Sequence, residues 1–163
     1  MRHTTMDTPA GPLTIVVDDT GAVRGSGFTA DVADLIRLMH PSLVEPTRPV
    51  DDVGAAGAAV RSYLDGDTSA LDTVPVAQRT GGAFRAHAWE VMRDIKAGSP
   101  VTYTGFAVLA GRPLAVRAAA AACARNAAAP FVPCHRVLRT DGTLGGYRWG
   151  LPVKTWLLAH EAA

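Results

Sequence analysis

The segment Phe131-Val132-Pro133-Cys134-His135-Arg136-Val137-Leu138 is an apolar run interrupted by a thiol, an imidazole and a guanidinium. This pattern predicts a rigid, largely buried turn that holds a reactive cysteine. A free thiol, with a pKa of about 8.5, is a poor nucleophile until a base or a positive charge favours the thiolate. His135 and Arg136 are suitable neighbours for that purpose. The alternative is that Cys134 is an inert core residue, because free cysteine is among the most buried residue types.

The composition is that of a globular protein with one or two small domains. The chain has 163 residues, of which 48% are hydrophobic and 19% are charged. Its two cysteines, Cys123 and Cys134, argue against a disulfide scaffold and predict a reducing, cytoplasmic setting. Residues 1–11 lack the apolar core of a signal peptide, and no uncharged apolar stretch is long enough to cross a bilayer. We therefore expect no membrane association.

The net charge of +1 hides an asymmetry between the two halves of the chain. Residues 1–78 carry five arginines against eleven acidic residues, whereas residues 79–163 carry eleven basic residues against four acidic ones. A basic half joined to an acidic half favours a polyanionic partner, of which nucleic acid is the commonest. The alternative is a solvated basic face that has no partner.

The first half predicts a small supporting domain of strands and helices. β-Branched runs, helical apolar spacing and turn residues mark its elements. The expected elements are strands at residues 11–17 and 22–28 and helices at residues 31–39 and 54–64. A turn-rich stretch follows at residues 67–82, and we place the domain boundary between residues 78 and 79.

The second half, residues 79–163, predicts a mainly helical domain. Helical apolar spacing, a capping threonine and a proline suited to the first helical position mark its elements. Helices are expected at residues 84–95, 102–110, 113–125 and 151–161. The middle two match a helix-turn-helix pattern, although any corner between two helices has a similar spacing. The predicted fold class is α+β, a small sheet-plus-helix domain followed by a helical, winged-helix-like domain.

The expected helix at residues 113–125 carries unusually small side chains. Arg117, Ala121 and Arg125 form one stripe at i, i+4 and i+8, and nearly every other position is alanine, cysteine or valine. Such a helix can approach another surface closely, which suits a DNA minor groove with one arginine projecting into it. The alternative is an alanine-rich helix packed inside its own protein.

Two further segments can complete a site around the cysteine. The glycine-rich loop at residues 140–147 surrounds Tyr147 and fits either a flexible wall over a pocket or an ordinary surface turn. The last expected helix carries Glu161 and can return it toward His135. A carboxylate that accepts a hydrogen bond from an imidazole fixes its tautomer and raises its basicity.

These residues resemble the O6-alkylguanine-DNA alkyltransferases, also called methylated-DNA–protein-cysteine methyltransferases. The matching positions are Phe84, Trp89, Tyr103, Ala115-Val116-Arg117-Ala118, Asn126, Pro133-Cys134-His135-Arg136-Val137, Gly146-Tyr147, Leu157-Leu158 and Glu161. The resemblance covers residues 80–161 well and is looser in the first half, at residues 8–13 and 63–66. An acceptor motif with correctly spaced partners is far more specific than a lone Cys-His pair.

The resemblance implies DNA repair by direct reversal of the damage. Cys134 would take the alkyl group irreversibly from O6-alkylguanine in double-stranded DNA, with O4-alkylthymine as a second candidate lesion, so that each molecule reacts once. His135, oriented by Glu161 and acting through a water, would draw the proton from the thiol. Tyr103 would help turn the nucleotide and donate to the departing guanine, and Asn126 would brace the acceptor turn. No metal, organic cofactor, membrane or further protein partner is implied.

The resemblance also implies which residues meet the DNA and the alkyl group. The helix-turn-helix would dock in the minor groove, and Arg117 would fill the place in the base stack that the extruded nucleotide leaves. The residues expected at the DNA are Tyr103, Arg117, Ala118, Ala121, Arg125 and Arg136. The residues expected around the alkyl group are Val137, Tyr147, Arg148 and Trp149.

The chain departs from the family pattern at two places near this site. The usual Gly-Asn-Pro is Arg125-Asn126-Ala127 here, which implies a looser brace after the helix. Trp149 stands where many relatives have glycine, and its larger side chain would narrow the pocket. The first half has no cysteine, so the structural zinc site of some relatives is not expected. His3, His40 and His87 are expected to be surface or packing residues and not metal ligands.

Two functions from other classes are alternatives. A non-catalytic DNA-binding module would flag lesions without removing the alkyl group. Relatives of that kind replace the acceptor cysteine, so Cys134 argues against this function. A cysteine hydrolase would use the same thiol with His135 or His160, but the sequence has no oxyanion-hole or substrate-cleft signature.

Overall fold

The computed structural model describes all 163 residues, and the chain divides into two compact units. The first unit is Met1–Arg79 with Ala127–Phe131, and the second is Thr80–Asn126 with Val132–Ala163. These units are defined by contacts in the folded chain and not by independent folding. The predicted domain boundary between residues 78 and 79 therefore stays a prediction. None of the helices has the length and apolar content that a membrane span requires.

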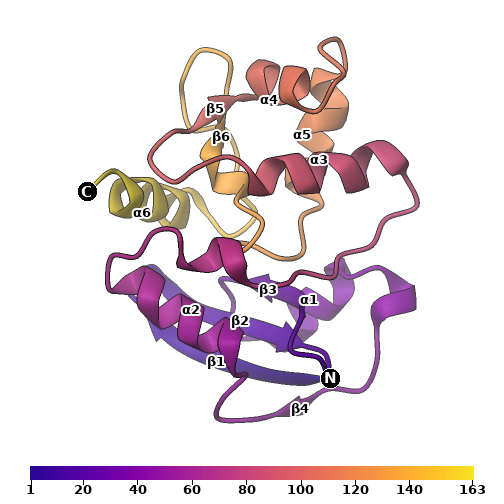
Figure 1. The fold of residues 1–163 in the computed structure, drawn as a ribbon, viewed down its shortest axis with the longest axis vertical. Helices are drawn as coiled ribbons and strands as arrows, with labels where there is room; N and C mark the ends of the chain where they lie inside the picture. Colours follow the sequence, from indigo (N-terminus) through magenta and orange to yellow (C-terminus); the bar gives the residue numbers. More distant parts are fainter. The chain divides into compact units, whose positions relative to one another are not determined.

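A four-stranded sheet with the strand order β3-β2-β1-β4 forms the base of the first unit (Figure 1). Its strands are β1 (Arg2–Thr8), β2 (Gly11–Val17), β3 (Val23–Gly27) and β4 (Arg48–Pro49). β2 pairs antiparallel with both β1 and β3, and β4 pairs parallel with β1. The predicted strands at residues 11–17 and 22–28 are confirmed. β1 was not predicted, because Met6 is its only large apolar residue.

β2 supplies the centre of the core of the first unit. Every residue from Leu13 to Val17 is buried, so the sheet is covered on both faces at this strand. The helix α2 (Ala55–Leu64) packs against β2, and α1 (Val32–Leu38) packs against β3. Both helices confirm predicted ones. Shorter 3-10 helices occur at Pro41–Leu43 and Ala70–Thr73.

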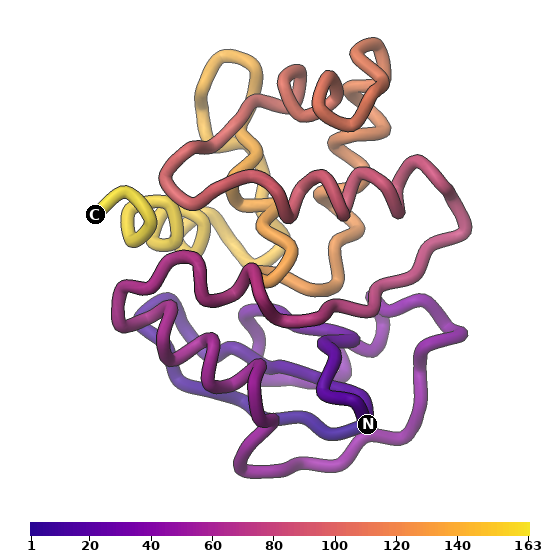
Figure 2. Tube along the Cα trace, in the orientation of Figure 1, coloured from indigo at the N-terminus to yellow at the C-terminus, as the bar shows by residue number.

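The second unit is mainly helical, as the sequence predicts. Its helices are α3 (Ala83–Arg93), α4 (Tyr103–Leu109), α5 (Val116–Ala124) and α6 (Leu151–Ala162). Two short parallel strands, β5 (Val101–Thr102) and β6 (Val137–Leu138), pair within it. α5 packs against both α3 and α4, and the Trp89 indole nitrogen on α3 donates to the Ala122 carbonyl on α5 at 2.9 Å. Figure 2 traces this unit from α3 to the C-terminal helix α6.

α4 and α5 are the two helices of the predicted helix-turn-helix. Thr102 caps α4 as predicted, because its hydroxyl accepts from the Gly105 backbone nitrogen at 3.0 Å. The prediction that Pro113 begins the second helix is wrong, since α5 begins only at Val116. Residues 112–115 form a turn instead, closed by a 2.9 Å backbone hydrogen bond, and proline suits the second position of such a turn equally well. That this pair binds DNA as a winged-helix-like unit stays a prediction.

Replacing Phe106 by alanine should lower the free energy of unfolding by about 3–5 kcal/mol, because its ring is fully buried in α4 and leaves a cavity when removed. Val108→Ala on the same helix is the matched control. Since Val108 is 53% exposed, its replacement should change stability by less than about 0.5 kcal/mol. Urea denaturation measures both values, and equal losses would contradict this packing.

Candidate active site

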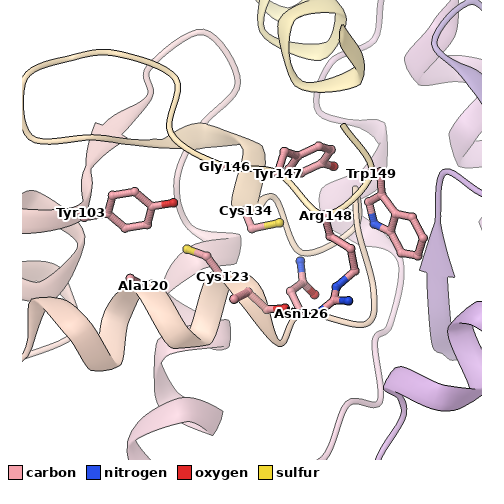
Figure 3. A pocket seen from close by; sticks show the side chains of 10 residues that line it. Tyr103, Ala120, Cys123, Asn126, Cys134, Gly146, Tyr147, Arg148 and Trp149 are labelled. Atoms are coloured by element: carbon pink, nitrogen blue, oxygen red, sulfur yellow. Dashed lines mark hydrogen bonds between the residues drawn. The ribbon is translucent and has the colours of Figure 1, made fainter. Parts of the chain in front are cut away.

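A cavity of about 350 Å³ lies in the second unit, with Cys134 in its wall (Figure 3). The lining residues come from the start of α4, the second half of α5, the acceptor turn and the glycine-rich loop. They are Tyr103, Ala120, Cys123, Ala124, Asn126, Cys134, Gly146, Tyr147, Arg148 and Trp149. In Figure 3 the Tyr103 hydroxyl points toward the two cysteines, whose side chains lie next to each other between Tyr103 and Arg148. A volume of this size is at the lower end for small-molecule pockets and suits one flat aromatic group.

The acceptor turn is a single 3-10 turn, Cys134–Arg136, inside a stretch that is buried throughout from Phe131 to Val137. Cys134 is 8% exposed and opens on the cavity, so it is not sealed in hydrocarbon. The Asn126 side-chain amide donates to the Val132 carbonyl at 2.7 Å and also hydrogen-bonds the Cys134 thiol. Asn126 therefore has the geometry of the predicted brace.

A buried network of three charged or polar side chains lies behind the thiol. The last turn of α6 brings Glu161 to the acceptor turn, where its carboxylate lies 2.8 Å from His135 Nε2. The Arg136 guanidinium donates to both carboxylate oxygens, at 3.0 and 2.9 Å, and to the Ile95 carbonyl at 2.6 Å. All three side chains are at most 1% exposed. The carboxylate is thus compensated by an adjacent cation, as a buried charge requires.

The protonation states of this network follow from its hydrogen bonds. Burial acts to raise the pKa of Glu161, but hydrogen bonds from His135 and Arg136 outweigh it and hold that pKa at about 2. An ionised carboxylate only accepts, so His135 Nε2 must carry the proton. Burial lowers the pKa of His135, which keeps the ring neutral near pH 7. His135 Nδ1 makes no hydrogen bond within the protein and is left with its basic lone pair.

The thiol and the phenol of the cavity are both protonated at rest. Burial raises the pKa of the Cys134 thiol, and the Asn126 amide and the Lys154 ammonium act against that rise. Burial, with a smaller contribution from the nearby thiols, raises the pKa of Tyr103 to about 12. Cys134 therefore needs a base when it reacts, and Tyr103 is available as a hydrogen-bond donor.

Lys154 is a site residue that the sequence analysis missed. Its fully buried ammonium donates to the carbonyls of Val137 at 2.9 Å, Leu144 at 2.5 Å and Gly146 at 3.4 Å. It thereby ties the glycine-rich loop to β6, directly after the acceptor turn. The helical spacing in the sequence could have predicted this burial. Lys154 lies three residues before Leu157 and seven before Glu161, which puts all three on the same face of the last helix.

Two other features hold the glycine-rich loop against the cavity. The Arg148 guanidinium donates to the Ala124 carbonyl at the end of α5, at 2.8 Å. Gly145 has a left-handed backbone with φ of +70°, and a Cβ there would lie 3.4 Å from the Tyr103 ring and 3.3 Å from the Arg139 side chain. The left-handed backbone favours glycine at this position, and the absence of a side chain leaves the loop room beside the phenol. The loop forms a wall of the cavity.

Two predicted site residues lie elsewhere. The prediction that Arg136 contacts DNA is wrong, because its side chain is buried and its guanidinium is bonded to Glu161 and the Ile95 carbonyl. The prediction that Val137 surrounds the alkyl group is also wrong. Val137 is fully buried on β6 and is absent from the cavity wall.

The other residues predicted to meet DNA are at the surface or half-buried. Arg117, Ala118 and Arg125 are exposed, and Ala121 and Tyr103 are half-buried. Their contacts with DNA stay predictions. His160 stacks on Trp156, with ring centroids 4.7 Å apart, and does not line the cavity.

Comparison with known proteins places this chain among DNA repair proteins. Residues 83–163 match the family model described as "6-O-methylguanine DNA methyltransferase, DNA binding domain". A methylated-DNA–protein-cysteine methyltransferase from Shigella flexneri is 34% identical over 94% of this chain and 91% of that protein. The human protein of the same name is 30% identical over 99% of this chain and 80% of its own length. The crystal structure of Mycobacterium tuberculosis OGT in complex with DNA has a TM-score of 0.80 and 26% identity, covering 99% of this chain and 93% of that one.

The buried carboxylate should make stability depend on pH. Because the pKa of Glu161 falls from an ordinary 4.5 to about 2 on folding, its ionised form stabilises the fold above about pH 4.5. That contribution, on the order of 3 kcal/mol, should be lost as the pH falls through 2. Chemical denaturation between pH 6 and about pH 2 measures it.

Glu161→Gln should remove most of this pH dependence. It should also lower stability at neutral pH by about 3–5 kcal/mol, because it leaves the Arg136 charge buried without its carboxylate. Glu90→Gln is the matched control, since the Glu90 side chain is 83% exposed and its replacement should change little. An unchanged acid profile in Glu161→Gln would contradict the assigned charge state.

Proposed function

The chain belongs to the 6-O-methylguanine DNA methyltransferase family, and from this premise we propose that Cys134 removes the alkyl group from O6-alkylguanine in double-stranded DNA. One observation carries the proposal. The Cys134 thiol opens on a cavity sized for one base, and the next residue is an imidazole held by a buried carboxylate. A nucleophile, a base and a group that orients the base are thus brought together.

Cys134 can reach the alkylated base only if that base leaves the DNA double helix. The exposed α5 surface, with small side chains around Arg117, suits a minor groove, and Arg117 would occupy the vacated place in the stack. Extrusion costs a few kcal/mol and is cheapest for a base that already pairs poorly. An O6-alkylated guanine is such a base. Arg125, Ala118 and Ala121 would lie along the DNA backbone on the same helix.

The transfer is an in-line displacement at the alkyl carbon. A water placed between the His135 imidazole and the Cys134 thiol would relay the thiol proton to His135 Nδ1. The other ring nitrogen, Nε2, is held by Glu161. The sulfur–carbon bond forms as the carbon–O6 bond breaks, and the electron pair leaves on guanine. Tyr103, still protonated because its pKa is about 12, would donate to the departing base. The thioether product is a poor leaving group, so the acceptor is used once.

The two alternatives of other classes fit the site less well. A module that only flags lesions has no use for the His135–Glu161 pair behind a thiol. A hydrolase with His160 would need that ring near Cys134, and His160 stacks on Trp156 instead. We further propose that the chain acts in the cytoplasm without a required protein partner, in keeping with its two free thiols.

Incubation with DNA that carries a labelled methyl group on guanine O6 tests this function. The label should move to Cys134 in a one-to-one ratio with protein, and Cys134→Ser should take up none. Peptide mapping by mass spectrometry identifies the labelled residue. Label that stays on the DNA while the protein binds would support lesion flagging, and turnover of an ester without label uptake would support a hydrolase.

Arg117→Ala should slow methyl removal from duplex DNA by about tenfold or more, because the finger offsets part of the cost of extrusion. The reaction with the free alkylated base should slow far less, since no stack is opened. Single-turnover rates on both substrates measure the difference. Arg37→Ala, an exposed arginine of the first unit, is the control for lost charge. Equal losses on the two substrates would refute the finger role.

Trp149 lines the cavity and should disfavour bulky alkyl groups. Free O6-benzylguanine should therefore inactivate the protein slowly, and Trp149→Gly should be inactivated about tenfold faster or more, because a larger pocket accepts the benzyl ring. Competition against methylated DNA measures residual acceptor activity. Strong inactivation of the unaltered protein would show that the indole leaves the pocket open.

A further inference from the structure

The cavity contains the only two cysteines of the chain. Cys123, near the end of α5, and Cys134, in the acceptor turn, both line it, and both are free thiols. Figure 3 shows the two cysteine side chains as neighbours at the wall of this cavity, with the Cys123 sulfur directed toward Tyr103 and the Cys134 sulfur toward Tyr147 and Arg148. Methyl transfer as described above uses one of these thiols and leaves the other without a role.

A wall residue at position 123 does not need to be a cysteine. The neighbouring wall positions on α5, Ala120 and Ala124, are alanines, and so is most of the helix. Cys123 is also unsuited to be a second acceptor of methyl groups. Burial raises its pKa strongly, with a further contribution from the nearby Cys134, and its chain neighbours are Ala122 and Ala124, whereas Cys134 is followed by His135.

We propose that Cys123 is the resolving thiol of Cys134, so that oxidation of the acceptor by a hydroperoxide ends in a reversible disulfide. Cys134 reacts first, because the Asn126 amide hydrogen-bonds its sulfur and favours the thiolate, and because His135, the base of the proposed transfer, directly follows it in the chain. A small oxidant reaches it through the same cavity that would admit the base. The consequence for repair rests on the proposed function, whereas the disulfide itself does not.

The chemistry takes two balanced steps. The Cys134 sulfur attacks the peroxide O–O bond, which gives a sulfenic acid on Cys134 and releases an alcohol, or water from hydrogen peroxide. The Cys123 sulfur then attacks the sulfenic sulfur, the S–O bond breaks, and the hydroxyl leaves as water with the Cys123 proton. A dithiol reductant restores both thiols. Without a second thiol, the sulfenic acid would proceed to a sulfinic acid, which is irreversible in most proteins.

The positions of the two cysteines in the chain favour this pairing. Cys123 is in the last turn of α5, which ends at Ala124, and helix ends adjust more easily than helix centres. Cys134 begins its own 3-10 turn. Asn126, which follows the end of α5, hydrogen-bonds the Val132 carbonyl and the Cys134 thiol and so links α5 to the acceptor turn. A disulfide would hold the acceptor sulfur out of reach of an alkyl group while keeping it recoverable.

Peptide mapping tests the disulfide without any DNA substrate. Trypsin cleaves after Arg117, Arg125 and Arg136, which places the two thiols in adjacent peptides, 118–125 and 126–136. After the reduced full chain is treated with hydrogen peroxide and its remaining thiols are blocked with iodoacetamide, these peptides should appear as one linked species. Its mass should be lower than the sum of the two by two hydrogens, and reduction should separate it.

Cys123→Ala tests the protective role, since alanine already occupies most of α5. Each protein is compared with its own untreated acceptor activity. After peroxide, a dithiol should restore most activity in the unaltered chain and little in Cys123→Ala, whose Cys134 should carry a sulfinic acid. Cys134 sulfinic acid at equal yield in both proteins, with no linked peptide, would overturn the proposal. A linked peptide in a protein that takes up no methyl label would instead contradict only the proposed function.

Discussion

A carboxylate buried between an imidazole and a guanidinium is the constraint on which the rest of the site depends. A lone buried carboxylate would be far too costly, so Glu161 can lie behind the acceptor turn only if Arg136 lies there with it. This requirement explains why the arginine of the acceptor turn is hidden from solvent. It also anchors α6 to the acceptor turn and fixes the tautomer of His135. The Glu161 carboxylate thus sets the charge balance of the buried network, the packing of α6 on the acceptor turn and the tautomer of His135.

The cavity in front of that network is built from segments far apart in the chain. The start of α4 contributes Tyr103, α5 contributes small side chains, and the glycine-rich loop closes the remaining side. The loop has few side chains of its own to pack, so its position depends on two cations, Lys154 and Arg148, that bind backbone carbonyls. Glycine at position 145 permits its close approach to the phenol. The Cys134 thiol therefore lies in the wall of a cavity whose glycine-rich side is held by hydrogen bonds from Lys154 and Arg148.

Sequence patterns predicted the parts of the structure that rest on local preferences or on a specific motif. Apolar spacing located most helices, and the acceptor motif with a distant glutamate led to Cys134, His135 and Glu161, which the fold brings together. Sequence patterns gave wrong predictions where contacts between distant segments decide the conformation or the burial of a residue. Pro113 fits a turn as well as a helix start, and Arg136, which the resemblance implied at the DNA, is buried by contacts with Glu161 and Ile95 from distant parts of the chain. Lys154 shares a helix face with Glu161, but a lysine is rarely expected to be buried.

The central claim is that His135 is a neutral base whose Nε2 proton is held by Glu161 and whose Nδ1 keeps a free lone pair that can take a proton. Nitrogen NMR of the labelled imidazole near pH 7 distinguishes the two neutral tautomers and the imidazolium. The account predicts a protonated Nε2 and an unprotonated Nδ1, and loss of that preference in Glu161→Gln. A proton on Nδ1 in the unaltered protein, or a charged ring at that pH, would contradict it.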